Sequence, residues 1–241
     1  MLALILKEVR GFLGSLIGHI VIAVFLLLTG LFLWVFPNNI LDGGYADLAP
    51  LFFIAPWVFL FLVPAVTMRS FSEEKRTGTI EFLLTKPLSE YQVVLAKYLA
   101  AVLLLVFALL PTLIYWYSLH DLAVPRGNVD TGGILGSYLG LLFLASCFAS
   151  IGVFASALTD SQIIAFLVSV FLCFFLYLGF DLIASFDAFG ALEGPVKSVG
   201  IQAHYLSMSR GVIALNDVLY FAGTIVIFLL LTRTALQSRK W

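Results

Sequence analysis

Charged residues are scarce in this sequence. Asp, Glu, Lys and Arg make up 11% of its 241 residues, whereas hydrophobic residues make up 62%. Soluble domains carry about 25% charged residues, so the composition excludes an ordinary soluble enzyme. The 23 Phe, 9 Tyr and 4 Trp exclude a disordered chain, and a net charge of −1 leaves no basic field for nucleic acid. The sequence is that of an integral membrane protein.

Motifs for catalysis and metal binding are also lacking. No Gly-Lys dipeptide is present, so the chain has no phosphate-binding loop of the type that hydrolyses ATP. The two cysteines, Cys147 and Cys173, and the three histidines, His19, His120 and His204, do not have the spacing of metal ligands. We therefore expect no catalytic residue, metal site or cofactor in this chain, and expect each histidine to be a packed or interfacial residue.

Six apolar stretches approach the length of about 20 residues that a helix needs to cross a bilayer. The predicted spans are residues 17–36, 51–68, 98–119, 132–158, 162–180 and 218–236. The fold class is therefore an all-α integral membrane protein, formed by a single domain over residues 1–241. Lys97, Asp181 and Arg233 are placed at span edges, where long or terminal side chains can reach the interface. Ion-coupled transport has no visible machinery in such spans.

The basic residues indicate the orientation of the spans. With both termini in the cytoplasm, ten of the 13 Lys and Arg residues fall on the inner side, and only Arg126, Lys197 and Arg210 fall outside. This asymmetry follows the positive-inside rule and predicts cytoplasmic termini. The first span is too long for a signal peptide and has no A-x-A site after it, so we expect it to be retained.

Two segments outside the spans have amphipathic patterns. The first is predicted to be an interfacial helix with Lys7 and Arg10 toward the lipid phosphates. Its apolar face would be formed by Leu2, Ile5, Leu6, Val9, Phe12 and Leu13. The second, residues 181–217, is too polar to span and too apolar for a solvated loop. It is predicted to form short helices that enter the outer leaflet before the last span.

Small residues recur at a spacing of four in the fourth span. They are Gly132, Gly136 and Gly140, followed by Gly152 and Ser156. Such a stripe allows helix backbones to approach one another closely. Packing within this chain is the favoured interpretation, and a subunit interface is the alternative.

Polar residues are concentrated in the inner loop formed by residues 69–90. Ser70 with Glu73 has the pattern of a capping box, and Ser89 with Gln92 has the same pattern before the third span. Between them lies an apolar ridge, defined by Ile80, Phe82, Leu83 and Leu84, which ends at Pro87. A solvated loop explains the basic residues of this segment but not the ridge. A short helix that docks on a soluble partner explains both.

The same loop resembles the cytoplasmic loop of ABC-2-type permeases, the membrane subunits of ATP-binding-cassette exporters. The resemblance lies in residues 73–87, EEKRTGTIEFLLTKP, and in the order of the six spans. Longer blocks at residues 15–37, 55–71, 109–118 and 209–221, and the C-terminal LQSRKW, resemble the GldF group of gliding-motility permeases.

This resemblance implies the permease half of an exporter in a bacterial inner membrane. ATP and Mg would be bound by a separate cytoplasmic ATPase, of the GldA type, and a second permease chain, of the GldG type or a second copy, would complete the transport unit. The loop helix would dock in a groove on the ATPase. Its docking residues would be Glu73, Glu74, Arg76, Gly78, Thr79, Glu81, Phe82, Leu83, Leu84 and Pro87. Leu83 and Leu84 would be the buried anchors, and the exposed rim would be formed by Glu73, Glu74, Arg76 and Glu81. A membrane scaffold that anchors motility or secretion machinery without transport is the alternative function.

Overall fold

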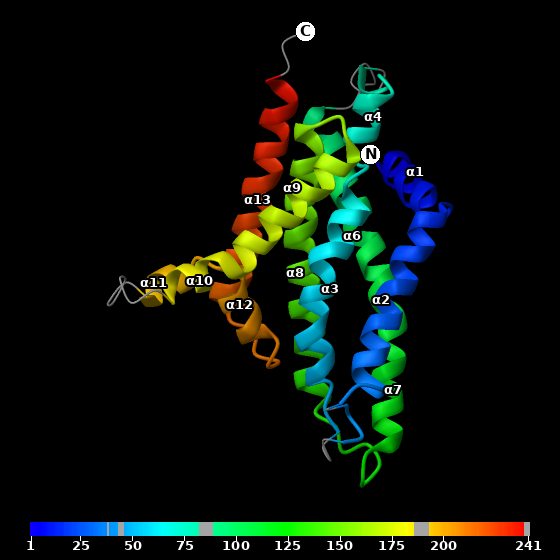
Figure 1. The fold of residues 1–241 in the computed structure, drawn as a ribbon, viewed down its shortest axis with the longest axis vertical. Helices are drawn as coiled ribbons and strands as arrows, with labels where there is room; N and C mark the ends of the chain where they lie inside the picture. Colours follow the sequence, from blue (N-terminus) through cyan, green and yellow to red (C-terminus); the bar gives the residue numbers. More distant parts are fainter. Residues whose placement is uncertain (38, 43–45, 82–88, 186–192, 239–241) are drawn as a thin grey trace.

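A computed structural model describes residues 1–37, 39–42, 46–81, 89–185 and 193–238, and Figure 1 shows them as an elongated bundle of helices. These residues contain helices and no strand, which confirms the predicted all-α class. Six helices among them are long and apolar enough to cross a membrane, as predicted. They are Leu16–Trp34, Ala49–Arg76, Glu90–Leu122, Thr131–Leu158, Gln162–Ala184 and Leu215–Gln237.

Several of these spans are divided into shorter elements by turns or changes of helix type. In the first half of the chain the elements are α1 (Leu2–Leu13), α2 (Leu16–Trp34), α3 (Ala49–Thr67), α4 (Ser72–Arg76), α6 (Glu90–Leu109), the 3-10 turn η1 (Leu110–Thr112) and α7 (Leu113–Leu122). In the second half they are α8 (Thr131–Leu158), α9 (Gln162–Phe174), the π-helical turn η2 (Phe175–Gly179), α10 (Phe180–Ala184), α11 (Glu193–Lys197), α12 (Ile201–Met208) and α13 (Leu215–Gln237).

The fourth span, α8, forms the core of the bundle. In its most apolar window 78% of the residues are buried, compared with 22% in α2 and in α13. It packs against α3, α6, α9 and α13. Because α8 is surrounded by other helices of the same chain, the outer helices α2, α9 and α13 carry the surface that faces lipid or another subunit.

Small residues on α8 allow this packing. A Cβ atom at Gly152 would lie 2.0 Å from Oγ1 of Thr67 in α3, and one at Gly140 would lie 2.8 Å from Cβ of Met208 in α12. At these two positions the neighbours belong to the same chain. The stripe therefore serves packing within this chain, as the favoured interpretation predicted.

The third span begins earlier than its apolar stretch suggested. Ser89 caps α6: its Oγ accepts a hydrogen bond from the Gln92 amide (3.3 Å), and Gln92 Oε1 accepts one from the Ser89 amide (3.1 Å). The predicted second capping box is confirmed. Because this cap starts the helix at Glu90 and not at residue 98, Lys97 lies about 10 Å along the axis from the first helical residue.

The N-terminal helix packs against the bundle with part of its predicted apolar face. Leu4, Ile5 and Phe12 are buried, and α1 lies against α6. Leu2 is 70% exposed and Leu6 is 44% exposed. The helix itself is confirmed, but only part of its apolar surface contacts the bundle, so Leu2 and Leu6 are available for the membrane.

The polar segment before the last span contains two short helices, α11 and α12. Figure 1 shows α10 and α11 extending sideways from the bundle, while α12 lies against α8 and α13. The Tyr205 hydroxyl donates to the Phe52 carbonyl of α3 (2.6 Å), and His204 Nδ1 lies 2.7 Å from Asp217 Oδ1 of α13. His204 is thus a packed residue that joins α12 to α13.

Candidate functional site

The described part of the 69–90 loop that follows α3 lies at one end of the bundle, together with α1 and the C-terminal end of α13 (Figure 1). It consists of a turn after α3, the short helix α4, a second turn over residues 77–79, and helical backbone at residues 80–81. Four of the predicted docking residues, Phe82, Leu83, Leu84 and Pro87, lie outside the described residues. The other six belong to α4 or to the five residues that follow it.

The first predicted capping box, between Ser70 and Glu73, is wrong. The N-cap of α4 is Phe71, and no side chain of α4 caps the helix. The first amides are bound instead by α8, because Ser156 Oγ accepts hydrogen bonds from Phe71 N (2.8 Å) and Ser72 N (3.1 Å). The Ser156 hydroxyl donates to the Met68 carbonyl (3.0 Å). A single buried hydroxyl of α8 therefore fixes the start of α4.

The other end of α4 is also joined to α8. The Lys75 ammonium donates to the Ala157 carbonyl, one residue beyond Ser156. Thr77 closes the helix with its own hydroxyl, which donates to the Glu73 carbonyl (2.9 Å). Since both ends of α4 are tied to the core helix, a force applied to α4 reaches α8 directly.

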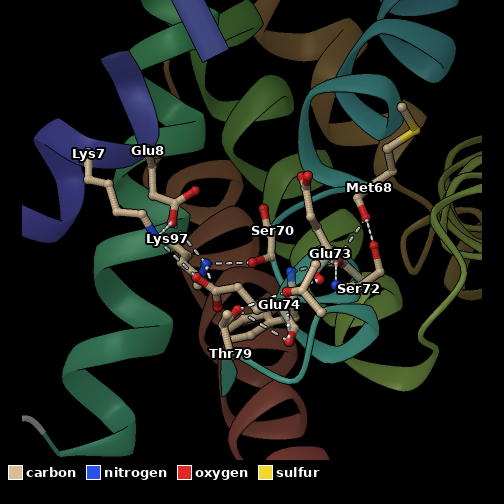
Figure 2. Close-up of polar contacts among 12 residues, drawn as sticks. Lys7, Glu8, Met68, Ser70, Ser72, Glu73, Glu74, Thr79 and Lys97 are labelled. Atoms are coloured by element: carbon tan, nitrogen blue, oxygen red, sulfur yellow. Dashed lines mark hydrogen bonds and ion pairs between the residues drawn. The ribbon is translucent and has the colours of Figure 1, made fainter. Parts of the chain in front are cut away.

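A buried ion-pair network joins α4 to two further helices (Figure 2). Lys97 of α6 places its Nζ atom 3.0 Å from Glu8 Oε1 of α1 and 3.0 Å from Glu74 Oε2 of α4. The same ammonium donates to the Ser70 carbonyl and lies 5.1 Å from the centre of the Phe71 ring. The Lys97 side chain is 1% exposed, and Glu74 is 12% exposed. We call Glu8, Glu74 and Lys97 the ionic junction.

The junction corrects two predictions. Lys97 was expected to extend to the membrane surface from the edge of a span. It stays inside the protein instead, because two carboxylates neutralise its charge there. Glu74 was expected to be an exposed rim residue of a docking helix, but it points inward to Lys97. Lys97, Glu8 and Ser156 were all absent from the predicted site.

One sequence signal could have indicated Glu8. Leu4, Glu8 and Phe12 are spaced by four residues, so they lie on one side of a helix. Leu4 and Phe12 are buried, and the acidic residue between them is therefore on the packed side. A charged residue in the middle of an apolar stripe predicts a buried partner of opposite charge.

The remaining described residues of the site form an exposed edge. The exposed residues are Arg76, Thr77, Gly78, Thr79 and Glu81. Ile80, between Thr79 and Glu81, is 8% exposed and packs into the bundle. The hydroxyls of Thr77 and Thr79 lie 2.9 Å apart. The loop thus presents a short polar edge to its surroundings and keeps the first residue of the apolar ridge in the bundle.

Gly78 allows the chain to turn between α4 and the ridge. Its φ is +69°, and no atom of the described residues other than its two chain neighbours lies within 4 Å of an added Cβ. The turn therefore requires glycine for its backbone angle and not for close contact with the described part of the chain.

The effect of a substitution at Gly78 is expected to depend on how well the new residue tolerates a positive φ. Gly78→Val should destabilise the loop by about 1–2 kcal/mol, whereas Gly78→Asn should be mild because Asn tolerates a left-handed backbone. Coupled ATP hydrolysis by the complex measures the effect, with membrane insertion as the control. Equal activity in Val and Asn variants would show that the angle is unimportant; equal loss in both would point to contact with a partner.

Comparison with protein families identifies the chain. The model of the ABC-2 family of transporter proteins matches residues 2–240. The chain belongs to the ABC-2 family. Its membrane helices are the transmembrane component of a transporter whose ATPase is a separate subunit. Comparison with curated proteins gives no match.

Among the described residues no group of three or more His, Cys, Asp or Glu could hold a metal ion. Glu8, Glu74 and Lys97 pair with one another, and the side chains of Ser156, Lys75 and Thr77 bond to backbone groups. This arrangement is suited to holding helices together, and it leaves an exposed edge available for a protein partner.

Proposed function

We propose that this chain is the non-catalytic permease subunit of an ABC-2-type exporter and that its 69–90 loop receives the movement of the ATPase. The observation that carries the proposal is the attachment of α4. Its inner side is joined to α8, α6 and α1, while residues 76–79 and Glu81 form an exposed edge at the end of the bundle. A partner bound to that edge would act on three helices at once.

The orientation and partners follow from the same proposal. The end of the bundle that carries α4 faces the cytoplasm, where the ATPase binds ATP and Mg. A second permease chain, either a GldG-like subunit or a second copy, packs against the outer helices, of which α2, α9 and α13 have only 22–28% of their apolar windows buried. The membrane is the bacterial inner membrane.

The biological setting proposed for the exporter is gliding motility. Support comes from the sequence blocks that resemble the GldF group, which are distributed from residue 15 to the C-terminus. The ATPase would then be GldA-like.

Affinity purification tests the proposed function. A tag on this chain, expressed in its native membrane, is expected to retain a P-loop ATPase that hydrolyses ATP in the purified complex. A matched complex with the P-loop lysine of that ATPase replaced should have the same subunits and no hydrolysis. Recovery of motility or secretion components without any ATPase would contradict the proposal and favour the membrane scaffold.

A further inference from the structure

The ionic junction places a full positive charge inside the protein. Lys97 is 1% exposed and has its two carboxylate partners on two other helices, Glu8 on α1 and Glu74 on α4, each at 3.0 Å. Glu8 and Glu74 are farther from bulk solvent than ordinary surface acids, with 25% and 12% of their side chains exposed. Three helices therefore meet at one ammonium group.

Stability alone is a weak reason for such an arrangement. Removing charges from water carries a desolvation penalty that ion pairing often only balances, and well-packed apolar residues can replace buried ion pairs without loss of stability. Removal of one partner, in contrast, leaves an uncompensated buried charge. The junction thus makes the positions of α1, α4 and α6 depend on one another more strongly than apolar contacts would.

The space beside the junction strengthens this dependence. A cavity of about 400 Å³ lies between α1, α3, α4 and α6, and its lining includes Gly11, Arg69 and Thr79 as well as the junction. Because open space lies between the described parts of α1 and α4 there, the ion pairs link these helices across the cavity. Lys7, which is 67% exposed, adds a longer contact to Glu74 (3.5 Å).

We infer that Lys97 is a positioning residue of the coupling site, which links the 69–90 loop to the N-terminal helix. When the ATPase displaces α4, Glu74 pulls on Lys97, and Lys97 carries the displacement to Glu8 and α1. The N-terminal helix is then a moving part of the transporter and not only a membrane anchor. This inference rests on the proposed function, since it requires an ATPase that acts on the loop.

Hydrogen exchange in the complete complex tests the link. The complex with its ATPase is reconstituted in lipid nanodiscs, and amide exchange is compared with and without Mg and a non-hydrolysable ATP analogue. In the wild type, nucleotide is expected to change exchange both in residues 69–81 and in residues 2–13. The second change is the one that the junction predicts.

Two variants interrupt the link at different points. Lys97→Met removes the ammonium and keeps an unbranched side chain, and Glu8→Gln removes the charge of the α1 partner while Lys97 and Glu74 stay paired. Both are expected to weaken the nucleotide response of residues 2–13, of which the Lys7–Glu74 contact can keep a part, and to retain the response of residues 69–81. Lys97→Arg, which keeps the charge, should restore the α1 response. Arg10→Met, which removes an exposed charge of α1 outside the junction, should behave as wild type.

The outcomes separate this inference from the proposed function. An unchanged α1 response in Lys97→Met and Glu8→Gln would overturn the inference, as would a wild-type response confined to residues 69–81. A lower unfolding temperature in Lys97→Met with a normal α1 response would show that the junction has a purely structural role. If neither segment of the wild type responds to nucleotide, the proposed function fails and the inference fails with it. If Lys97→Met does not fold, Glu8→Gln still decides the question.

Discussion

Replacement of Leu84 by aspartate is expected to release the ATPase from the membrane complex. Helix-in-groove recognition concentrates its binding energy in a few buried apolar anchors, and the sequence pattern of the ridge places Leu83 and Leu84 in that role. A carboxylate in an apolar groove would lose solvation without gaining a partner. The expected loss is at least about 2 kcal/mol of binding free energy, or roughly 30-fold in Kd.

Binding of the purified ATPase to nanodisc-embedded permease measures this effect. Leu84→Met keeps the volume and polarity of the anchor and should bind nearly as wild type. Leu41→Asp makes the same chemical change at an exposed leucine outside the loop and should not affect binding. Wild-type affinity of Leu84→Asp, in a protein that inserts normally, would contradict docking through the ridge.

The structure shows which residues of the loop can serve as exposed controls in the docking experiment. Glu74→Ala was expected to have a small effect because exposed ion pairs contribute about 1 kcal/mol or less. Glu74 is instead paired with a buried ammonium, so its removal would disturb the junction. Arg76 and Glu81 are exposed, and Arg76→Ala and Glu81→Ala are the suitable rim variants. Each is expected to weaken docking by about 1 kcal/mol at most.

Local sequence signals predicted the membrane architecture well. Apolar runs of about 20 residues determine helices in a bilayer because backbone groups must be satisfied within the segment. The capping box at Ser89 and Gln92 is also local, since donor and acceptor are three residues apart, and it forms as predicted. Gly78 lies between two threonines where the sequence indicates a turn, and its positive φ shows that the backbone angle favours glycine there.

Contacts between distant segments were the part that the sequence could not provide. Ser70 and Glu73 have the pattern of a capping box. The acceptor for the first amides of α4 is nevertheless Ser156 of α8, so a tertiary contact replaces the local motif. Lys97 was placed at the edge of the third span because the apolar stretch used to predict that span begins directly after this charged residue. Its partners come from α1 and α4, and no pattern around residue 97 indicates them.

The attachment of α4 to α8 leads to the second large effect. Ser156→Ala is expected to detach the start of α4, because the amides of Phe71 and Ser72 would lose their buried acceptor. A buried donor left without a partner costs about 1–3 kcal/mol, so the two amides together imply about 2–6 kcal/mol. Local opening of the segment would then become at least about 30-fold more frequent.

Amide exchange of a peptide that covers residues 68–76 measures this opening. Ser150→Ala is the matched control, since Ser150 is equally buried on α8 and its hydroxyl donates to the Cys147 carbonyl of its own helix (2.7 Å). That variant should be nearly neutral, because alanine is the better helix former. Ser156→Cys should be intermediate, since sulfur is a weak acceptor. Equal exchange in Ser156→Ala and Ser150→Ala would show that Ser156 does not hold α4, and the path of force from the loop to α8 would have to run through Lys75 and the backbone after α3.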